Sequence, residues 1–193
     1  HRVITLFEDR QGSLWIGTRG GGLVRLREGA FERFDTSSGL PNNRVRSIFE
    51  DRRGRLWVGT DGGLGRLEDG RFVVPPGLNA RPYVVMAMAE SDEGLWIGTD
   101  GDGLLRLTDA IEVFTTRQGP SSDAVRALHL GSDGTLWVGT RGGLDRFARG
   151  RFEPVAGPQP RWSAVSALQE DGDGNLWVGT RGGGLLRRHG ESW

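Results

Sequence analysis

The chain has 193 residues, with 33 glycines, 8 prolines and no cysteine. Glycine makes up about 17% of the 193 residues, more than twice its usual share, which excludes a helical bundle and favours short strands joined by turns. The 25 basic and 25 acidic residues cancel, which argues against binding to nucleic acid or an anionic membrane. Without cysteine, disulfides, thiolate zinc sites and cysteine nucleophiles are excluded. No apolar run reaches the roughly 18 residues that span a bilayer.

A repeat of about 40 residues organises the chain. The pentapeptide Leu-Trp-Ile/Val-Gly-Thr occurs five times, and its tryptophans are 42, 39, 41 and 40 residues apart. They are Trp15, Trp57, Trp96, Trp137 and Trp177. This period is typical of the four-stranded antiparallel blade of a β-propeller. Helical arrays have similar periods, but no stretch between turn signals is long enough for a helix of about ten residues.

The second repeat illustrates the predicted blade in chain order. Residues 45–51 are expected to form the inner strand, and strands at 55–60 and 64–68 follow after glycine turns. Asp69-Gly70 is a hairpin signal, and residues 71–74 are expected to form the outer strand. The predicted blades cover residues 3–44, 45–83, 84–124, 125–164 and 165–193.

The fifth predicted blade is incomplete. It ends at Trp193, which aligns with Phe31, Phe72 and Phe152 at the start of the outer strand. The sequence is therefore compatible with a five-bladed ring with an imperfect seam or with a segment of a larger propeller, and we expect the segment. The repeated tryptophans are interpreted as packing residues. The glycine two positions after each one is expected to make room for an aromatic side chain of the adjacent blade.

The repeat resembles that of the two-component regulator propeller family. Asp9-x-x-Gly12-x-Leu14-Trp15-Ile16-Gly17-Thr18 carries the full pattern, and the repeats that begin at Asp51 and Asp171 carry it too. Gly39-Leu40-Pro41-Asn42-Asn43 resembles the linker between blades of that family. Two repeats depart from it: the third lacks one residue before Gly94, and in the fourth Gly131 replaces the aspartate.

The resemblance implies an extracytoplasmic, periplasmic ligand-sensing propeller, usually of seven blades, in a bacterial membrane receptor. The implied output is a sensor histidine kinase, with a diguanylate cyclase as the alternative. The implied partners are a small-molecule or oligosaccharide ligand, the rest of the receptor chain and, in a homodimer, a second copy. Two other functions remain open from the residues: a scaffold for protein–protein contact and, least favoured, a propeller lyase.

No catalytic or metal-binding constellation is evident in the sequence, and no cofactor is predicted. The three histidines, His1, His129 and His189, share no metal-ligand spacing. Residues 171–175, Asp-Gly-Asp-Gly-Asn, open like an EF-hand calcium loop, but they lack its later glycine and glutamate. We interpret them as a polar hairpin turn, in which Asp171 binds nearby amides. The glycine runs at 19–22 and 181–184 resemble phosphate loops but join two strands, so they are interpreted as turns.

The candidate ligand site lies on the face formed by the inter-blade linkers and by the loops between the second and third strands. Charged residues follow each Gly-Thr, and polar or aromatic residues precede each inner strand. Such groups suit sugar rings or carboxylated sugars. The candidates are Arg19, Asn42, Arg44, Asp61, Arg81, Tyr83, Asp100, Asp123, Arg141, Trp162 and Arg181.

Overall fold

The computed structural model describes residues 2–78, 82–157 and 164–193. It forms two compact units, residues 1–88 and 89–193. The strands are β1 (Val3–Glu8), β2 (Leu14–Thr18), β3 (Leu23–Arg27), β4 (Ala30–Phe34), β5 (Val45–Glu50), β6 (Leu56–Thr60), β7 (Gly63–Glu68), β8 (Arg71–Val73), β9 (Val85–Ser91), β10 (Gly94–Thr99), β11 (Leu104–Leu107), β12 (Ile111–Phe114), β13 (Val125–Leu130), β14 (Leu136–Thr140), β15 (Gly143–Ala148), β16 (Arg151–Pro154), β17 (Val165–Glu170), β18 (Leu176–Thr180) and β19 (Gly184–Arg188).

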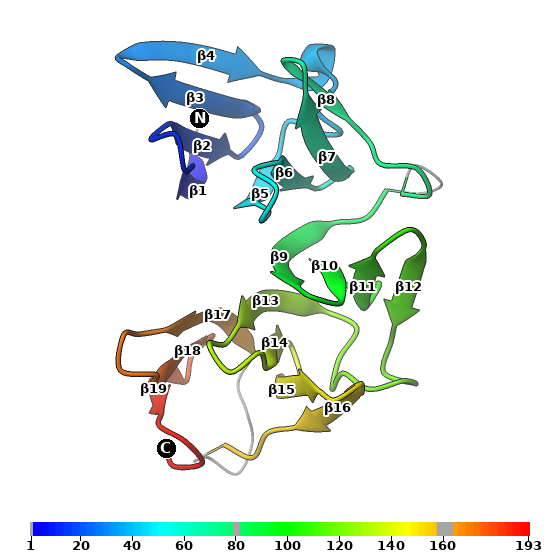
Figure 1. Ribbon diagram of the computed structural model, residues 1–193, viewed down its shortest axis with the longest axis vertical. Helices are drawn as coiled ribbons and strands as arrows, with labels where there is room; N and C mark the ends of the chain where they lie inside the picture. The colour runs from blue at the N-terminus through cyan, green and yellow to red at the C-terminus, as the bar shows by residue number, and fades with distance from the viewer. Residues whose placement is uncertain (1, 79–81, 158–163) are drawn as a thin grey trace. The chain divides into compact units, whose positions relative to one another are not determined.

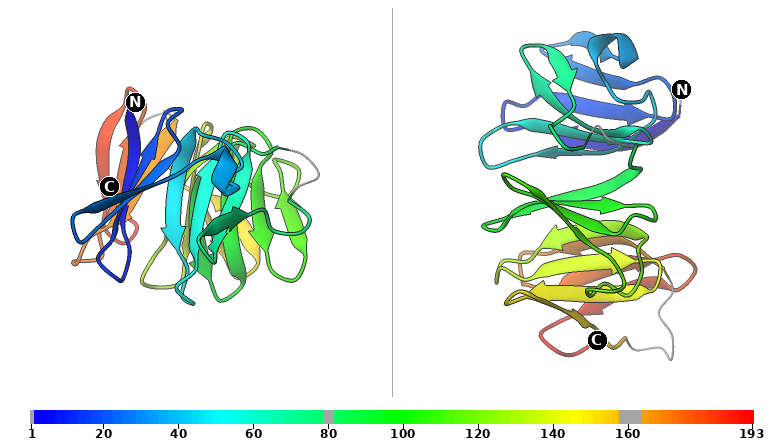
Figure 2. Two further views of the ribbon diagram at one scale, coloured as in Figure 1. Left: turned by 90° about the horizontal axis from the view of Figure 1, so that it is seen from above. Right: turned by 90° about the vertical axis from the view of Figure 1, so that its right-hand side faces the viewer.

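The strands form five antiparallel meanders in which each strand pairs with its neighbours in sequence (Figure 1 and Figure 2). We number these blades one to five in chain order; the first four have four strands and the fifth has three. The predicted all-β propeller of four-stranded blades is therefore confirmed. In the described residues the one helical element is a single 3-10 turn, η1 (Thr36–Ser38). No helix among them is long and apolar enough to cross a membrane.

The fifth blade begins a fourth strand. His189 and Ser192 exchange both backbone hydrogen bonds, at 2.8 and 3.0 Å. This pair corresponds to Arg27 and Ala30, the first pair of the β3–β4 hairpin. The alignment of Trp193 with the start of the outer strand is thus supported by the backbone register.

Each unit has its own apolar core. Trp15 and Trp57 in the first unit are 2% exposed, and Trp96 in the second is fully buried. In the first unit Trp15 packs against Phe34, and the ring of Phe34 meets that of Phe72 from the second blade edge-on. The burial of Trp15, Trp57 and Trp96 confirms that these repeated tryptophans serve packing, whereas Trp177 in the fifth blade is half-buried.

The strand glycines make room for valine, so the expected aromatic neighbour is wrong. A Cβ on Gly17 would lie 2.6 Å from Cγ1 of Val45, the first residue of the next inner strand. Gly98 and Gly139 meet Val125 and Val165 in the same way, at 2.8 and 2.5 Å. A β-branched side chain fills this space because the next inner strand crosses directly over the glycine, which leaves no depth for an aromatic ring.

Candidate functional site

An aspartate in the first turn of a blade holds the repeated tryptophan. Asp51 is 1% exposed and accepts hydrogen bonds from Trp57 Nε1 at 2.8 Å and from the amides of Arg53 and Arg55, both at 2.9 Å. Asp9 and Asp171 accept from their own tryptophans, both at 2.7 Å. These bonds explain the spacing of six residues between aspartate and tryptophan.

The same bonds shift the acidity of these carboxyl groups. Burial alone would raise the pKa of Asp51, but the hydrogen bonds from Trp57 and Arg55 outweigh it and lower that pKa. The bond from Trp177, with those from the backbone amides, lowers the pKa of Asp171 to about 2. Asp171 binds the amides of Asp173 and Asn175 as the turn interpretation predicts. In the described residues no group of three or more His, Asp or Glu side chains is arranged to hold a metal ion.

In the third and fourth blades a different residue stands in place of the aspartate that binds the repeated tryptophan. In the third blade Ser91 Oγ accepts from Trp96 Nε1 at 2.9 Å. In the fourth blade Gly131 keeps the backbone bonds of the turn, from its own amide to Thr135 and from Gly134 to its carbonyl. Its missing Cβ would lie 3.2 Å from Trp137 Nε1 and 3.1 Å from the Glu170 carboxylate.

On the linker face of the first unit, the glycine loop after Thr18 is hydrogen-bonded to Asn43 in the linker between the first and second blades. The amides of Gly20 and Gly22 both donate to the carbonyl of Asn43, at 3.0 and 2.9 Å, and Gly21 donates to Thr18 Oγ1. All three glycine amides are thus used within the fold, which supports the turn interpretation. Arg19 bridges Arg44 through the backbone and exposes its side chain.

Asp61, Arg44 and Arg46 form an ion-pair cluster on the linker face of the first unit. The Asp61 carboxylate lies 3.2 Å from Arg44 Nη1 and 2.5 Å from Arg46 Nε. The Asn42 side chain accepts from the Arg44 amide at 2.8 Å and so orients this linker. Sequence reasoning missed Arg46, which sits at a β-bulge in β5. Its signal was the Val-Arg pair that opens both β5 and β13.

The second unit repeats this arrangement with different partners. Asp100 lies 2.9 Å from Arg126 Nη2 and 3.6 Å from Arg141 Nη2. The carbonyl of Asp123 accepts from Gly101 and Gly103, as Asn43 does in the first unit, and its carboxylate accepts from the Thr116 amide. Arg126 occupies the bulge that Arg46 occupies in β5.

Four of the predicted ligand-binding residues remain to be placed. Arg181 is exposed in the second unit, and its amide donates to the Ala164 carbonyl at 2.8 Å. Tyr83 is half-buried in the first unit, just before β9. Arg81 and Trp162 lie outside the described residues. The structure thus brings Arg44 to Asp61 and Asp100 to Arg141, while a ligand-binding role for all eleven residues stays a prediction.

The buried carboxylate of Asp145 binds the linker between the third and fourth blades. Asp145 in β15 accepts from the amide and hydroxyl of Ser121, at 2.9 and 2.5 Å. Its burial raises its pKa, and the two bonds from Ser121 only partly oppose that shift. Sequence reasoning missed Asp145 because the second blade has Gly65 at this position, against which Pro41 packs.

The histidine of the fourth inner strand lies away from the linker face. His129 is near the far end of β13, and its Nε2 is 4.0 Å from the carboxylate of Glu170. Burial lowers the pKa of His129, and Glu170 opposes the shift. His129 therefore supplies no base to the linker face.

Four segments of the chain match the model of the family described as two component regulator propeller, at residues 1–20, 39–62, 119–142 and 161–182. No match was found among curated proteins.

Several solved structures share the fold. The extracellular domain described as the hybrid two component system BT4673 from B. thetaiotaomicron is 22% identical, with a TM-score of 0.77 over 96% of this chain and 29% of that one. A catalytically inactive virginiamycin B lyase from Staphylococcus aureus with quinupristin is 18% identical, with a TM-score of 0.74 over 96% of this chain and 69% of that one. PorZ, a surface component of the type-IX secretion system of Porphyromonas gingivalis, is 18% identical, with a TM-score of 0.66 over 99% and 32%. The chain spans less than a third of the length of BT4673.

Proposed function

Because the chain is built from repeats of the two component regulator propeller family, we propose that it is the extracytoplasmic ligand-sensing part of a bacterial receptor that feeds a sensor histidine kinase. The observation that carries the proposal is the recurrence of the family pattern in four segments. Its likeness to an extracellular receptor domain supports the same assignment at the level of the fold.

The proposed sensing surface is the linker face, considered separately in each unit. Backbone bonds from Gly20, Gly22, Gly101 and Gly103 fasten the linkers to the loops, so the exposed groups stand on an ordered frame. Arg19 and Arg141 present guanidinium groups to solvent. Planar guanidinium groups bind carboxylates and hydroxyls, which suits an oligosaccharide or another small hydroxylated ligand.

The ion-pair clusters give this face a means of response. In the first unit Asp61 pairs with both Arg44 and Arg46, at 3.2 and 2.5 Å. An anionic group that binds either arginine competes with Asp61, so that the linker that carries Arg44 is then held by its remaining hydrogen bonds alone and can shift. A change in linker position is the kind of signal that a receptor passes to its output domain.

The test uses the parent receptor in cells with a reporter gene for its output, exposed to a panel of neutral and carboxylated oligosaccharides. Arg19→Ala and Tyr83→Ala are expected to weaken the response to any active sugar by about 5- to 150-fold in half-maximal concentration. Trp57→Ala is the matched control, because loss of a buried tryptophan lowers the melting temperature and the amount of receptor together.

Two results would overturn the assignment. An unchanged response of both linker-face variants, at normal receptor levels, would remove the linker face as the sensing surface. A receptor whose output ignores the whole panel but depends on a bound protein would instead support the scaffold function.

A further inference from the structure

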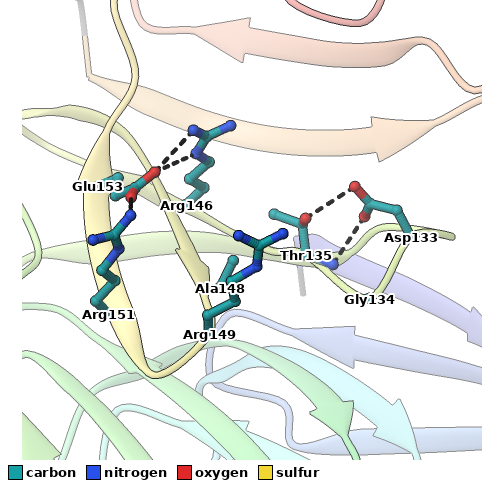
Figure 3. Close-up of a pocket in the computed structure, with 8 residues that line it drawn as sticks. All are labelled: Asp133, Gly134, Thr135, Arg146, Ala148, Arg149, Arg151 and Glu153. Carbon is teal, nitrogen blue, oxygen red and sulfur yellow. Dashed lines mark hydrogen bonds and ion pairs between the residues drawn. The ribbon is translucent and has the colours of Figure 1, made fainter.

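The fourth blade carries a pocket at the end opposite to its linkers. The pocket has a volume of about 440 Å³ and is formed by the turn between β13 and β14 and by the β15–β16 hairpin. Figure 3 shows its eight lining residues, none of them aromatic. They are Asp133, Gly134, Thr135, Arg146, Ala148, Arg149, Arg151 and Glu153.

The pocket occurs where the fourth blade departs from the repeat. In the first and third blades the arginine opposite the tryptophan on the next strand, Arg25 or Arg106, lies over the indole ring at 5.4 or 5.3 Å. In the fourth blade Arg188 from the fifth blade covers Trp137 instead, at 5.0 Å. Arg146, the residue opposite Trp137, is held at the pocket by other partners.

Arg146 and Arg151 share one carboxylate. Glu153 lies 2.8 Å from Arg146 Nη2 and 2.7 Å from Arg151 Nη2. These contacts lower the pKa of Glu153, and the contacts of Arg146 with Glu153 and Glu191 raise the pKa of Arg146. Arg146 Nη1 also lies 3.3 Å from the carboxylate of Glu191, which pairs with Arg188 at 2.8 Å. The guanidinium groups of Arg146 and Arg151 are therefore already paired with carboxylates.

Arg149 brings a further positive charge to the pocket. Across the described residues we find no ion pair of Arg149, and in Figure 3 its guanidinium lies between the Glu153 cluster and Thr135. Its backbone is left-handed, with φ at 54°, a conformation that glycine and asparagine adopt more readily.

Asp133 lines the opposite side of the pocket and carries one negative charge (Figure 3). It accepts from the Thr135 amide at 2.8 Å and from the Thr135 hydroxyl at 3.0 Å. The lining residues carry three arginines and two carboxylates, and a further carboxylate, that of Glu191, is shared between Arg146 and Arg188. A ligand that fits must bring an anionic group to Arg149 and polar groups to Asp133 and Thr135.

We propose that this pocket binds a small hydroxylated monocarboxylate of the size of a sugar acid, with its carboxylate on Arg149 and its hydroxyls toward Thr135 and Asp133. The volume lies within the range of small-molecule sites. Guanidinium groups bind carboxylates through paired hydrogen bonds. The polar lining disfavours an apolar ligand. The site is independent of the proposed sensor function, because it lies at the other end of the blade.

Titration calorimetry of the purified chain with glucuronate tests the proposal, with glucose and sulfate as the comparison probes. We expect saturable binding of glucuronate, binding at least about 10-fold weaker for glucose and for sulfate, and weakening by added salt. Arg149→Asn should weaken glucuronate binding by about 10- to 100-fold, since it removes one charged contact. Asparagine suits the left-handed turn, so this variant should fold at least as well as the wild type.

Glu28→Asn is the matched control, because Glu28 holds the same turn position in the first blade, with φ at 50°. It should leave glucuronate binding unchanged. No saturable binding of glucuronate at 10 mM, or equal affinity of Arg149→Asn and the wild type, would overturn the proposal. Equal affinity for sulfate and glucuronate would also overturn it, because it would identify a bare anion site.

Discussion

Replacing Asp51 with alanine should unfold the second blade more readily than almost any other single change in the first unit. Alanine leaves the Trp57 indole N–H and the amides of Arg53 and Arg55 without their acceptor. Arg55 also loses the contact of its Nε with the carboxylate, at 2.6 Å. Water cannot replace these bonds easily, because Asp51 is 1% exposed.

The magnitude follows from these contacts. A hydrogen bond to a charged group contributes about 1.5–3 kcal/mol, and the bonds to one carboxylate are not additive. Each buried donor left without an acceptor costs about 1–3 kcal/mol. Because three donors lose Asp51, and their costs are not additive, we expect about 3–5 kcal/mol for Asp51→Ala. For a chain of this size it corresponds to a drop of about 6–20 °C in melting temperature. Asp51→Asn should cost about 2 kcal/mol, because it keeps an oxygen for the amides but sets an NH₂ group against Trp57 Nε1.

Two measurements check this prediction. Thermal melts give the change in stability, and NMR hydrogen exchange at the tryptophan indoles locates it. The Trp57 indole should exchange much faster in both variants, while that of Trp177, held by Asp171, should not change. A melting temperature within about 1 °C of the wild type, with an unchanged Trp57 exchange rate, would refute the reasoning.

Three further predictions follow from the geometry. A Cβ on Gly22 would lie 2.2 Å from the carbonyl oxygen of Phe34, whereas a Cβ on Gly184 would meet no atom within 4 Å. In thermal melts Gly184→Ala should therefore cost about 1 kcal/mol of stability, and Gly22→Ala should cost several times as much. The Asp171 pKa of about 2 lies below its unfolded value, so this carboxylate stabilises the fold above about pH 4 and loses that effect as the pH falls toward 2; urea titrations should show less acid sensitivity in Asp171→Asn. The raised pKa of buried Asp145 means that its charge opposes folding at neutral pH. Asp145→Asn should therefore melt at or above the wild-type temperature at pH 7.5, with the gap closing as the pH falls.

The sequence by itself determined the blades, because the interactions that define them are local. Asp51 reaches Trp57 six residues later within the β5–β6 hairpin, and Asp69-Gly70 closes the β7–β8 hairpin. Such bonds depend on neighbours in the chain and repeat wherever the pattern repeats. The order of strands and the start of a fourth strand in the last blade followed from the same pattern.

Only the tertiary structure decided which charges meet. Asp61 pairs with Arg46 because a bulge turns that side chain toward the linker, and the residue pattern does not show which way a bulge points. Arg188 covers Trp137 from the next blade, which leaves Arg146 to Glu153 and the pocket. These contacts join residues that are far apart in the chain, and the packing of one blade on the next determines them. The repeated sequence gives every blade the same local pattern, so it does not show which side chains of the neighbouring blade will contact it.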